Sequence, residues 1–277
     1  MKTSSILLAA AATAQLLLTS PAIAGTDAPA SSGNFAEPLG ALPPPFGVSV
    51  LYTWEQQEYE VTGLRATAHG FPVPGFGPGA ITKLQNEVDD AIVKLDWWAL
   101  PWLNFHALAG RVSGQADADL APALWPMLGG ARQFKIDYDG DVYGGGMTLA
   151  AGYKHLFGLV TANYTWGDVN LKDGRGMSLV DPNGVETLVV TPKIGWKFDR
   201  GAVWVGGYYQ FTQHTQSGSI NLGPPMGTIQ FQADVKDKSP WNYTVGGEYK
   251  ITNNWILTAE IGLGGREQVM AGTTYRF

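Results

Sequence analysis

The last stretch of the chain, from Trp255 to Phe277, alternates with a period of two and ends on an aromatic residue. Successive side chains of an extended strand point to opposite faces. One face would carry Val269, Ala271, Thr273, Tyr275 and Phe277, and the other Gln268, Met270, Gly272, Thr274 and Arg276. Free termini fray unless something holds them. The pattern therefore predicts a terminal β-strand held to its last residue, with an apolar environment on one face and a polar one on the other.

The spacing of Gly272, Tyr275 and Phe277 resembles the final strand of bacterial outer-membrane β-barrel proteins. In that class, a glycine, two residues, an aromatic, one residue and a terminal aromatic form a signal for the barrel-assembly machinery. Met270 departs from the class, which usually has a polar residue two places before the glycine. The resemblance covers only the last strand, and it implies a class of protein and an assembly partner without a specific activity.

The N-terminus has the layout of a secretory signal peptide. Lys2 precedes an apolar run over residues 6–18, and Ala22-Ile23-Ala24 follows as a cleavage site. A membrane anchor helix needs about 20 apolar residues, and this run is shorter. We therefore expect residues 1–24 to be removed during export and the mature chain to begin at Gly25.

The mature chain divides into two parts. Residues 25–45 are rich in Ala, Ser, Gly and Pro, which predicts a flexible periplasmic leader with a stiff proline-rich end. Residues 46–277 hold the alternating segments. Since no other stretch could form a transmembrane helix, this region must cross a membrane as a closed barrel if it enters one.

Composition excludes several classes of protein. The chain has no cysteine, so neither disulfides nor thiolate metal sites stabilise it. Asp and Glu number 24 against 18 Lys and Arg, which makes nucleic acid an improbable partner. The 36 glycines, 12% aromatic residues and only 15% charged residues suit strands that face lipid on one side and a crowded interior on the other.

A weak internal repeat predicts the architecture. Four times a strand ends near an aromatic, a short turn follows and a new strand starts, whereas longer connections lie between these units. Outer-membrane barrels alternate short periplasmic turns with long extracellular loops in this way. Aromatics beside the short turns would then form the periplasmic girdle: Trp97, Trp102, Tyr153, Phe157, Trp196, Tyr249 and Trp255.

The sequence thus predicts an all-β fold, an up-and-down antiparallel transmembrane β-barrel of about ten strands. The strands would cover 46–58, 87–98, 103–113, 139–153, 157–169, 186–198, 202–215, 241–251, 255–264 and 266–277. Residues 227–235 also alternate, and we assign them to a β-extension of the fourth long loop. If that segment crossed the membrane, the barrel would have twelve strands.

The more apolar face of each strand should meet lipid, for example Val203, Val205, Tyr209 and Phe211 on one strand. The opposite faces predict the residues that line the lumen: Glu55, Lys94, Asp96, His106, Lys193, Glu248, Glu260 and Arg276. A barrel of about eight strands is filled by its own side chains, which favours a charge-paired plug. The alternative is a narrow polar path for a small solute or ion.

Catalytic and metal motifs are weak. His69, His106, His155 and His214 do not have the spacing of a local zinc site. His214 should lie near the extracellular rim, but its neighbours lack the patterns of barrel proteases and lipid-modifying barrels. An enzyme acting on lipid A or peptides, with His214 as base, stays an alternative to a histidine without a catalytic role.

The acidic segment 137–141 places carboxylates at alternate positions, as a calcium loop does. Its glycine is in the wrong place and Thr148 stands where a bidentate Glu is required, so we expect an acidic turn at the start of a strand. A weak calcium bridge to lipopolysaccharide remains open. No metal or cofactor is predicted.

The predicted loops are more apolar than exposed loops usually are. They hold Phe71, Val73, Phe76, Leu120, Leu124, Trp125, Met127, Leu128 and Met226. We expect these residues to pack on each other as a lid, because long loops need a core of their own. The alternative is an entry for a hydrophobic ligand or a surface for adhesion.

The sequence favours a non-enzymatic protein of the outer membrane, in contact with membrane lipids and lipopolysaccharide. It would be structural or would pass small solutes or ions. The alternatives are the rim enzyme and the barrel that binds a hydrophobic ligand or acts as an adhesin.

Overall fold

The computed structural model describes residues 44–68, 70–73, 77, 79–126, 130, 132–171, 177–179, 185–211, 213–221 and 228–277. The predicted signal peptide and the leader up to residue 43 lie outside the described residues. A short 3-10 helix, η1 (Pro122–Leu124), lies between two strands. Among the described residues, no helix has the length and hydropathy needed to span a bilayer.

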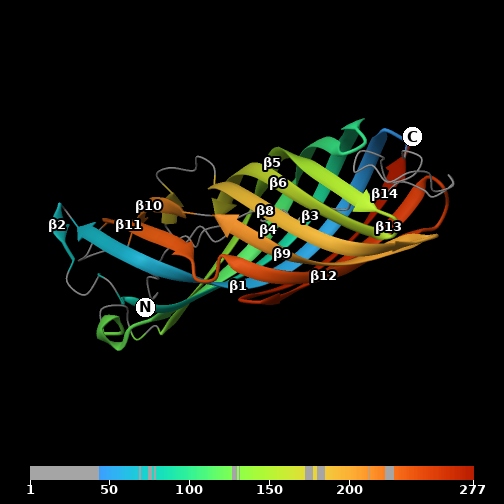
Figure 1. Cartoon of the computed structure of the whole chain (residues 1–277). Helices are drawn as coiled ribbons and strands as arrows, with labels where there is room; N and C mark the ends of the chain where they lie inside the picture. Colours follow the sequence, from blue (N-terminus) through green and yellow to red (C-terminus); the bar gives the residue numbers. More distant parts are fainter. Residues whose placement is uncertain are drawn as a thin grey trace.

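Ten antiparallel strands form a closed ring (Figure 1). They are β1 (Phe46–Ala68), β3 (Ile81–Leu100), β4 (Leu103–Leu120), β5 (Gln133–Tyr153), β6 (Leu156–Leu171), β8 (Val185–Phe198), β9 (Gly201–Phe211), β12 (Trp241–Lys250), β13 (Trp255–Gly264) and β14 (Arg266–Arg276). The ring closes where β1 pairs with β14, from Gly47 opposite Arg276 to Gln57 opposite Arg266. The predicted up-and-down barrel is confirmed.

Four further strands lie outside this ring: β2 (Phe71–Pro72), β7 (Met177–Leu179), β10 (Gln213–Asn221) and β11 (Thr228–Asp237). β11 pairs with β1 from Tyr59 to Ala68, beyond the point where β14 begins, and β10 pairs with β11. Figure 1 shows β2, β10 and β11 together at one end, away from the C-terminus. The described part of the segment 227–235, from Thr228, is therefore an extension, and the twelve-strand alternative is wrong.

The strands β1, β3, β4 and β5 are 18 to 23 residues long. A tilted strand needs only about 9–11 residues to cross the bilayer. Much of the two connections that the predicted bounds leave between these strands, 59–86 and 114–138, is therefore strand. Alternation continues there, with Ala116, Ala118 and Leu120 buried, but the outward residues are polar because they lie beyond the lipid.

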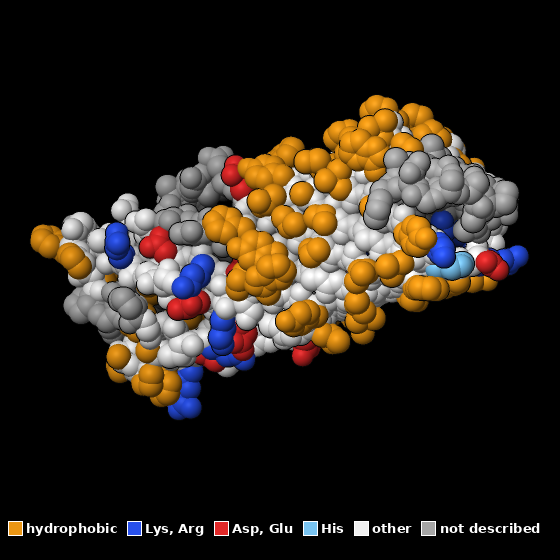
Figure 2. All heavy atoms as spheres, in the orientation of Figure 1, with side chains coloured by type: hydrophobic (Ala, Val, Ile, Leu, Met, Phe, Trp, Pro, Cys, Tyr) orange, Lys and Arg blue, Asp and Glu red, His pale blue; other side chains and the backbone are white. Residues whose placement is uncertain are grey.

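The outer faces of the strands form an apolar belt (Figure 2). Val203, Val205 and Phe211 are each more than half exposed, as are Ile194 and Leu263 on other strands. Within the predicted girdle, six aromatics lie on this surface: Trp97, Trp102, Tyr153, Trp196, Tyr249 and Trp255. Phe157 does not, because it is only 3% exposed and packs inside against Leu159, Ala202 and Trp204.

Apolar side chains fill the extended end of the barrel. The cluster includes Tyr59, Leu84, Val112 and Ile136 from the long strands and Leu124 from η1, all buried. Of the predicted lid residues, Val73, Leu120 and Leu124 belong to this cluster and Trp125 packs against it, whereas Phe71 is 76% exposed. Phe76, Met127, Leu128 and Met226 lie outside the described residues.

Candidate functional site in the barrel interior

Polar side chains occupy the inner face of the barrel within the apolar belt. All eight residues that the sequence predicts for the lumen point inward and are at most 7% exposed: Glu55, Lys94, Asp96, His106, Lys193, Glu248, Glu260 and Arg276. Strand alternation places them there, since their chain neighbours face lipid or water. Most of them gather in three layers, defined below, which follow one another along the barrel because Arg276 ends β14, Arg266 begins it and Glu260 lies between them on β13.

The lower layer lies at the end of the barrel where β1 begins and β14 ends. Arg276 Nη2 donates to Asp96 Oδ1 at 2.7 Å, and Asn104 Nδ2 donates to the same oxygen at 3.0 Å. Lys94 lies on the same face of β3, two residues before Asp96, and interacts electrostatically with Asp96 and Glu248. This layer therefore joins β3, β4, β12 and β14 through side chains.

The middle layer consists of Lys193 on β8, Trp204 on β9 and Glu260 on β13. Lys193 Nζ and Trp204 Nε1 both donate to Glu260 Oε2, and the Lys193 ammonium lies 5.2 Å from the centre of the Trp204 ring. Two glycines make room for these side chains. A Cβ atom at Gly206 would lie 2.8 Å from Lys193 Cγ, and one at Gly246 would lie 2.8 Å from Trp204 Nε1.

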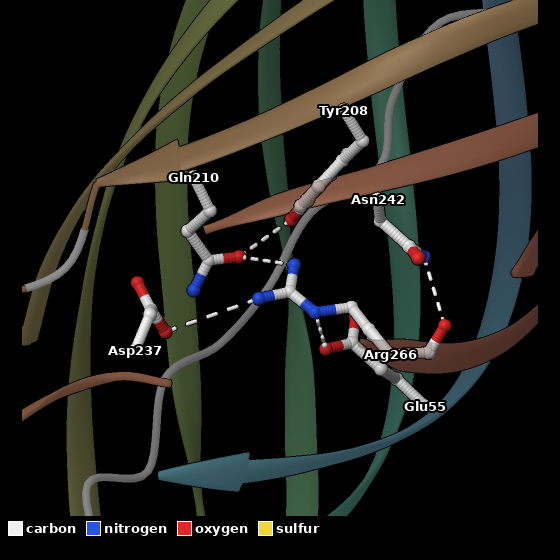
Figure 3. A network of polar contacts seen from close by, with 6 residues as sticks. All are labelled: Glu55, Tyr208, Gln210, Asp237, Asn242 and Arg266. Atoms are coloured by element: carbon white, nitrogen blue, oxygen red, sulfur yellow. Dashed lines mark hydrogen bonds and ion pairs between the residues drawn. The ribbon is translucent and has the colours of Figure 1, made fainter. Parts of the chain in front are cut away.

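The upper layer is built around Arg266, the first residue of β14 (Figure 3). Arg266 Nε lies 2.8 Å from Glu55 Oε1, and Arg266 Nη1 donates to Gln210 Oε1 at 2.6 Å. Tyr208 Oη donates to the same Gln210 oxygen at 2.6 Å, and its ring lies 4.7 Å from the guanidinium. Asp237 of β11 is 3.9 Å from Arg266 Nη2, which ties the extension to the barrel.

His106 lies on β4, across the barrel from Glu260, the carboxylate of the middle layer. Its Nε2 atom is 2.5 Å from Asn163 Oδ1, so β4 and β6 are joined across β5. The neighbouring hydroxyls of Thr148 and Thr161 lie 2.7 Å apart. These contacts are between uncharged polar groups and the His106 ring, in contrast to the ion pairs of the three layers.

Along the described residues, side chains fill the interior of the barrel. Side chains at every layer are nearly inaccessible, with Lys193 at 5%, Arg266 at 1% and Arg276 at 2% exposure. Above the layers, the apolar cluster of the extension closes the other end. The lumen thus consists of ion-paired layers beneath an apolar cap.

The wall of the barrel is interrupted between β8 and β9. Pro192 has no N–H to donate, and the ladder lacks the pairs Thr191–Tyr208 and Pro192–Gly207 while keeping its register on both sides. A cavity of about 1020 Å³ opens on the lipid face here. Lipid-facing residues such as Ile194 and Val205 line it, and so do the inward-facing Lys193, Gly206 and Thr244.

The remaining predicted sites are dispersed. Asp137, Asp139 and Asp141 lie within β5, where the sequence predicts a turn, and Asp139 accepts from Arg111 at 3.3 Å. The described residues contain no group of three or more His, Cys, Asp or Glu that could hold a metal. His214 lies on β10, opposite Val235, and its side chain and all of His69 lie outside the described residues.

Arg266 and Trp204, at the centres of two layers, are not among the eight residues predicted for the lumen. Arg266 follows two glycines, so it resembles a turn residue, yet it shares the inward phase of Gln268 and Arg276. Trp204 lies between Val203 and Val205, which face lipid as predicted, so the alternation itself predicts that Trp204 points inward. At the other end of β14, Tyr275 contacts Trp255 and stacks with Phe277. Of the predicted assembly signal, Gly272 and Tyr275 lie in β14, and Phe277 follows its last residue and donates to Phe46 O.

The closed ring, the apolar belt and the polar interior define the chain as an outer-membrane β-barrel protein, located in the outer membrane among its lipids. No family model and no curated protein sequence matches it. The fold is similar to that of OprG from Pseudomonas aeruginosa, with a TM-score of 0.46, 13% identity, and coverage of 85% of this chain and 97% of that one.

Two other solved structures are similar at the same level. The transport unit of the autotransporter AIDA-I from Escherichia coli has a TM-score of 0.41 and 13% identity, covering 88% of this chain and 94% of that one. The toluene transporter TbuX from Ralstonia pickettii has a TM-score of 0.36 and 10% identity, covering 85% and 90%. Likeness at these values carries no argument about what this chain does.

Proposed function

We propose that the chain is a non-enzymatic outer-membrane barrel that passes small solutes or ions through its polar interior, with the three layers as its gate. The observation that carries the proposal is the way in which the interior is closed. Among the described residues, ion pairs between long side chains fill it within the belt. Rotation of these side chains would open the three layers, and a continuous path also requires the side chains of the apolar cap to move.

The chemistry of the filling supports a path more than a scaffold. Replacing a buried ion pair by apolar residues of similar volume is often neutral or stabilising, so a purely structural barrel has no need of three charged layers. Several buried polar atoms also have no protein partner, among them the hydroxyls of Thr191, Thr244 and Thr258 and the side-chain amide of Gln268. Buried groups of this kind are usually satisfied by water.

Room for motion is built beside the middle layer. Lys193 lies over Gly206, and Trp204 lies over Gly246, so both can change rotamer without a Cβ in the way. Glu260 would lose both of its donors in such a motion and would become available to a passing cation or to water. The lumenal role of these residues follows from this proposal.

The test is planar-bilayer recording of the wild type beside the double variant Lys193→Ala/Glu260→Ala. Removing both partners avoids leaving one buried charge uncompensated. We expect small, voltage-dependent conductance for the wild type and a several-fold increase for the double variant. Leu257→Ala, which changes the lipid face, serves as control. Silence of the wild type and of the folded double variant at all voltages would leave only a structural role.

A second candidate function is the passage of a small apolar solute from the lipid side. The cavity at Pro192 favours it, because its lining is largely apolar and it touches the interior at Lys193 and Thr244. Since the chain has no cysteine, a disulfide can be placed across the interruption by Pro192→Cys/Gly207→Cys. Uptake of an apolar fluorophore into vesicles should fall on oxidation and return on reduction. Equal uptake in both states would reject this route.

A further inference from the structure

A second, smaller pocket lies at the rim of the short turns, away from the interior layers. Its volume is about 370 Å³, within the range of ligand pockets of about 300–1,000 Å³. The lining combines aromatic and charged side chains: His155, Trp196, Lys197, Phe198, Asp199, Arg200 and Tyr249. They come from the β5–β6 turn, the β8–β9 hairpin and the end of β12.

Backbone contacts between neighbouring hairpins fix the shape of this pocket. Lys197 N donates to His155 O at 2.7 Å, and Lys250 N donates to Arg200 O at 2.7 Å. The His155 ring stacks on Trp196 at 5.4 Å, and its Nδ1 atom lies 3.1 Å from Lys197 O. A pocket held in this way needs little ordering when a ligand binds.

Positive charge gathers around the pocket. The lining residues Lys197 and Arg200 are positive and Asp199 is negative, which leaves a surplus of one, and Lys154 and Lys250 directly adjoin the lining residues His155 and Tyr249 in the chain. The whole chain has a net charge of −6, so this surplus is local. Asp199 is the one carboxylate among the lining residues. The pocket is therefore suited to an anion.

The depth of the pocket in the membrane indicates which anion it binds. Trp196 is 54% exposed and Tyr249 is 49% exposed, and both belong to the aromatic girdle, which lies at headgroup level. Figure 2 shows charged and pale-blue side chains directly beside the orange belt at the end opposite the extension. The short turns face the periplasm, so phosphates of the inner leaflet lie at the pocket.

We propose that this pocket binds the phosphate of an anionic phospholipid from the periplasmic leaflet of the outer membrane. Arg200 is the exposed cation that contacts the phosphate, and Trp196, Phe198 and Tyr249 contact the glycerol and the first carbons of the acyl chains. Basic pockets beside membrane-spanning segments bind anionic headgroups in this manner. The site is independent of any path through the barrel.

The test uses the full mature protein, delipidated in neutral detergent. Thermal unfolding and native mass spectrometry are followed with added phosphatidylglycerol, phosphatidylethanolamine or inorganic phosphate. We expect phosphatidylglycerol to raise Tm with dose and to be retained, because a ligand that binds only the folded state stabilises it. Phosphatidylethanolamine should give a much smaller effect, and inorganic phosphate none at equal concentration.

Substitutions at three exposed residues test which side chains contribute to lipid binding. Arg200→Gln should weaken phosphatidylglycerol binding about tenfold, the loss expected for one hydrogen bond to a charged group. Asp199→Asn should strengthen it, and Lys135→Gln, at the far end of β5, should leave it unchanged. Equal retention of both phospholipids, or equal binding by Arg200→Gln and Lys135→Gln, would overturn the proposal. A full Tm shift with inorganic phosphate would overturn the assignment to a lipid.

Discussion

At the scale of single residues, Arg266 shows how this interior is stabilised. Its guanidinium contacts Glu55 of β1, Gln210 of β9 and Asp237 of β11, so one side chain joins β14 to three other strands. A buried ion pair adds little stability over an apolar pair, but loss of one partner leaves an uncompensated charge. The guanidinium is therefore costly to remove alone.

We predict that Arg266→Ala lowers the free energy of unfolding by about 3–5 kcal/mol. The double variant Arg266→Met/Glu55→Gln should recover most of this loss, because it removes both charges and keeps most of the volume. Urea unfolding in detergent micelles, followed by tryptophan fluorescence, measures both. A double variant less stable than Arg266→Ala would show that the charges themselves stabilise the barrel.

Glu58 provides a test with pH outside the membrane. Lys238 Nζ donates to its carboxylate and Lys83 lies 3.5 Å away, and these contacts hold the pKa of Glu58 below its ordinary value. A lowered carboxyl pKa stabilises the folded state above the unfolded pKa of about 4.3, and this contribution is lost as pH falls through the folded pKa.

Stability of the wild type should therefore fall more steeply than that of Glu58→Gln as pH drops from about 5 to about 3. The difference should be below about 1 kcal/mol, because this ion pair is exposed. Parallel slopes for the two proteins in denaturant titrations at each pH would contradict the assignment.

At the scale of strands, the two-residue period predicted the face on which each side chain lies better than it predicted where each strand ends. Residues 203, 205 and 211 face lipid as predicted, and all ten strands occur where alternation places them. Strands β1 and β3 to β5 extend beyond their predicted bounds, where their outward residues are polar. Outside the bilayer a strand faces water, so polarity there no longer separates strand from loop. Phe157 was misplaced because an aromatic beside a turn suits girdle and interior equally.

Glycines inside the wall give a matched pair of variants. A Cβ atom at Gly246 would lie 2.8 Å from both Trp204 Nε1 and Ala259 O, whereas at Gly158 the nearest atom is 3.8 Å away. Gly246→Ala should destabilise the barrel by about 1–3 kcal/mol, the usual cost of overpacking. Gly158→Ala should be neutral within about 0.5 kcal/mol. Equal unfolding midpoints for both variants would show that the middle layer adapts easily.

At the scale of the whole molecule, the extension formed by β10 and β11 depends on the barrel more than the barrel depends on the extension. The ten-stranded ring closes without β10 and β11, which pair only with β1, β7 and each other among the described strands. The extension depends on the ring, since β11 pairs along the upper part of β1.

We predict that replacing residues 212–238 by a short loop leaves a folded barrel. Heat-modifiable migration in gels should persist, because the β1–β14 closure is intact. Stability should fall, since Asp237 and Lys238 contacts are lost, and the freed edge of β1 should promote association of copies. Loss of the folded band would show that the extension is required for closure.

The sequence alone determined the class and the face on which most side chains lie, because alternation and turn spacing are local properties of the chain, and it left ten and twelve strands open. Only the tertiary structure decided which charges meet. Arg266 and Glu55 are 211 positions apart, and their contact depends on closure between β1 and β14. The interruption at Pro192 and the pocket at Arg200 were decided there too, since each arises between strands whose register no single segment specifies.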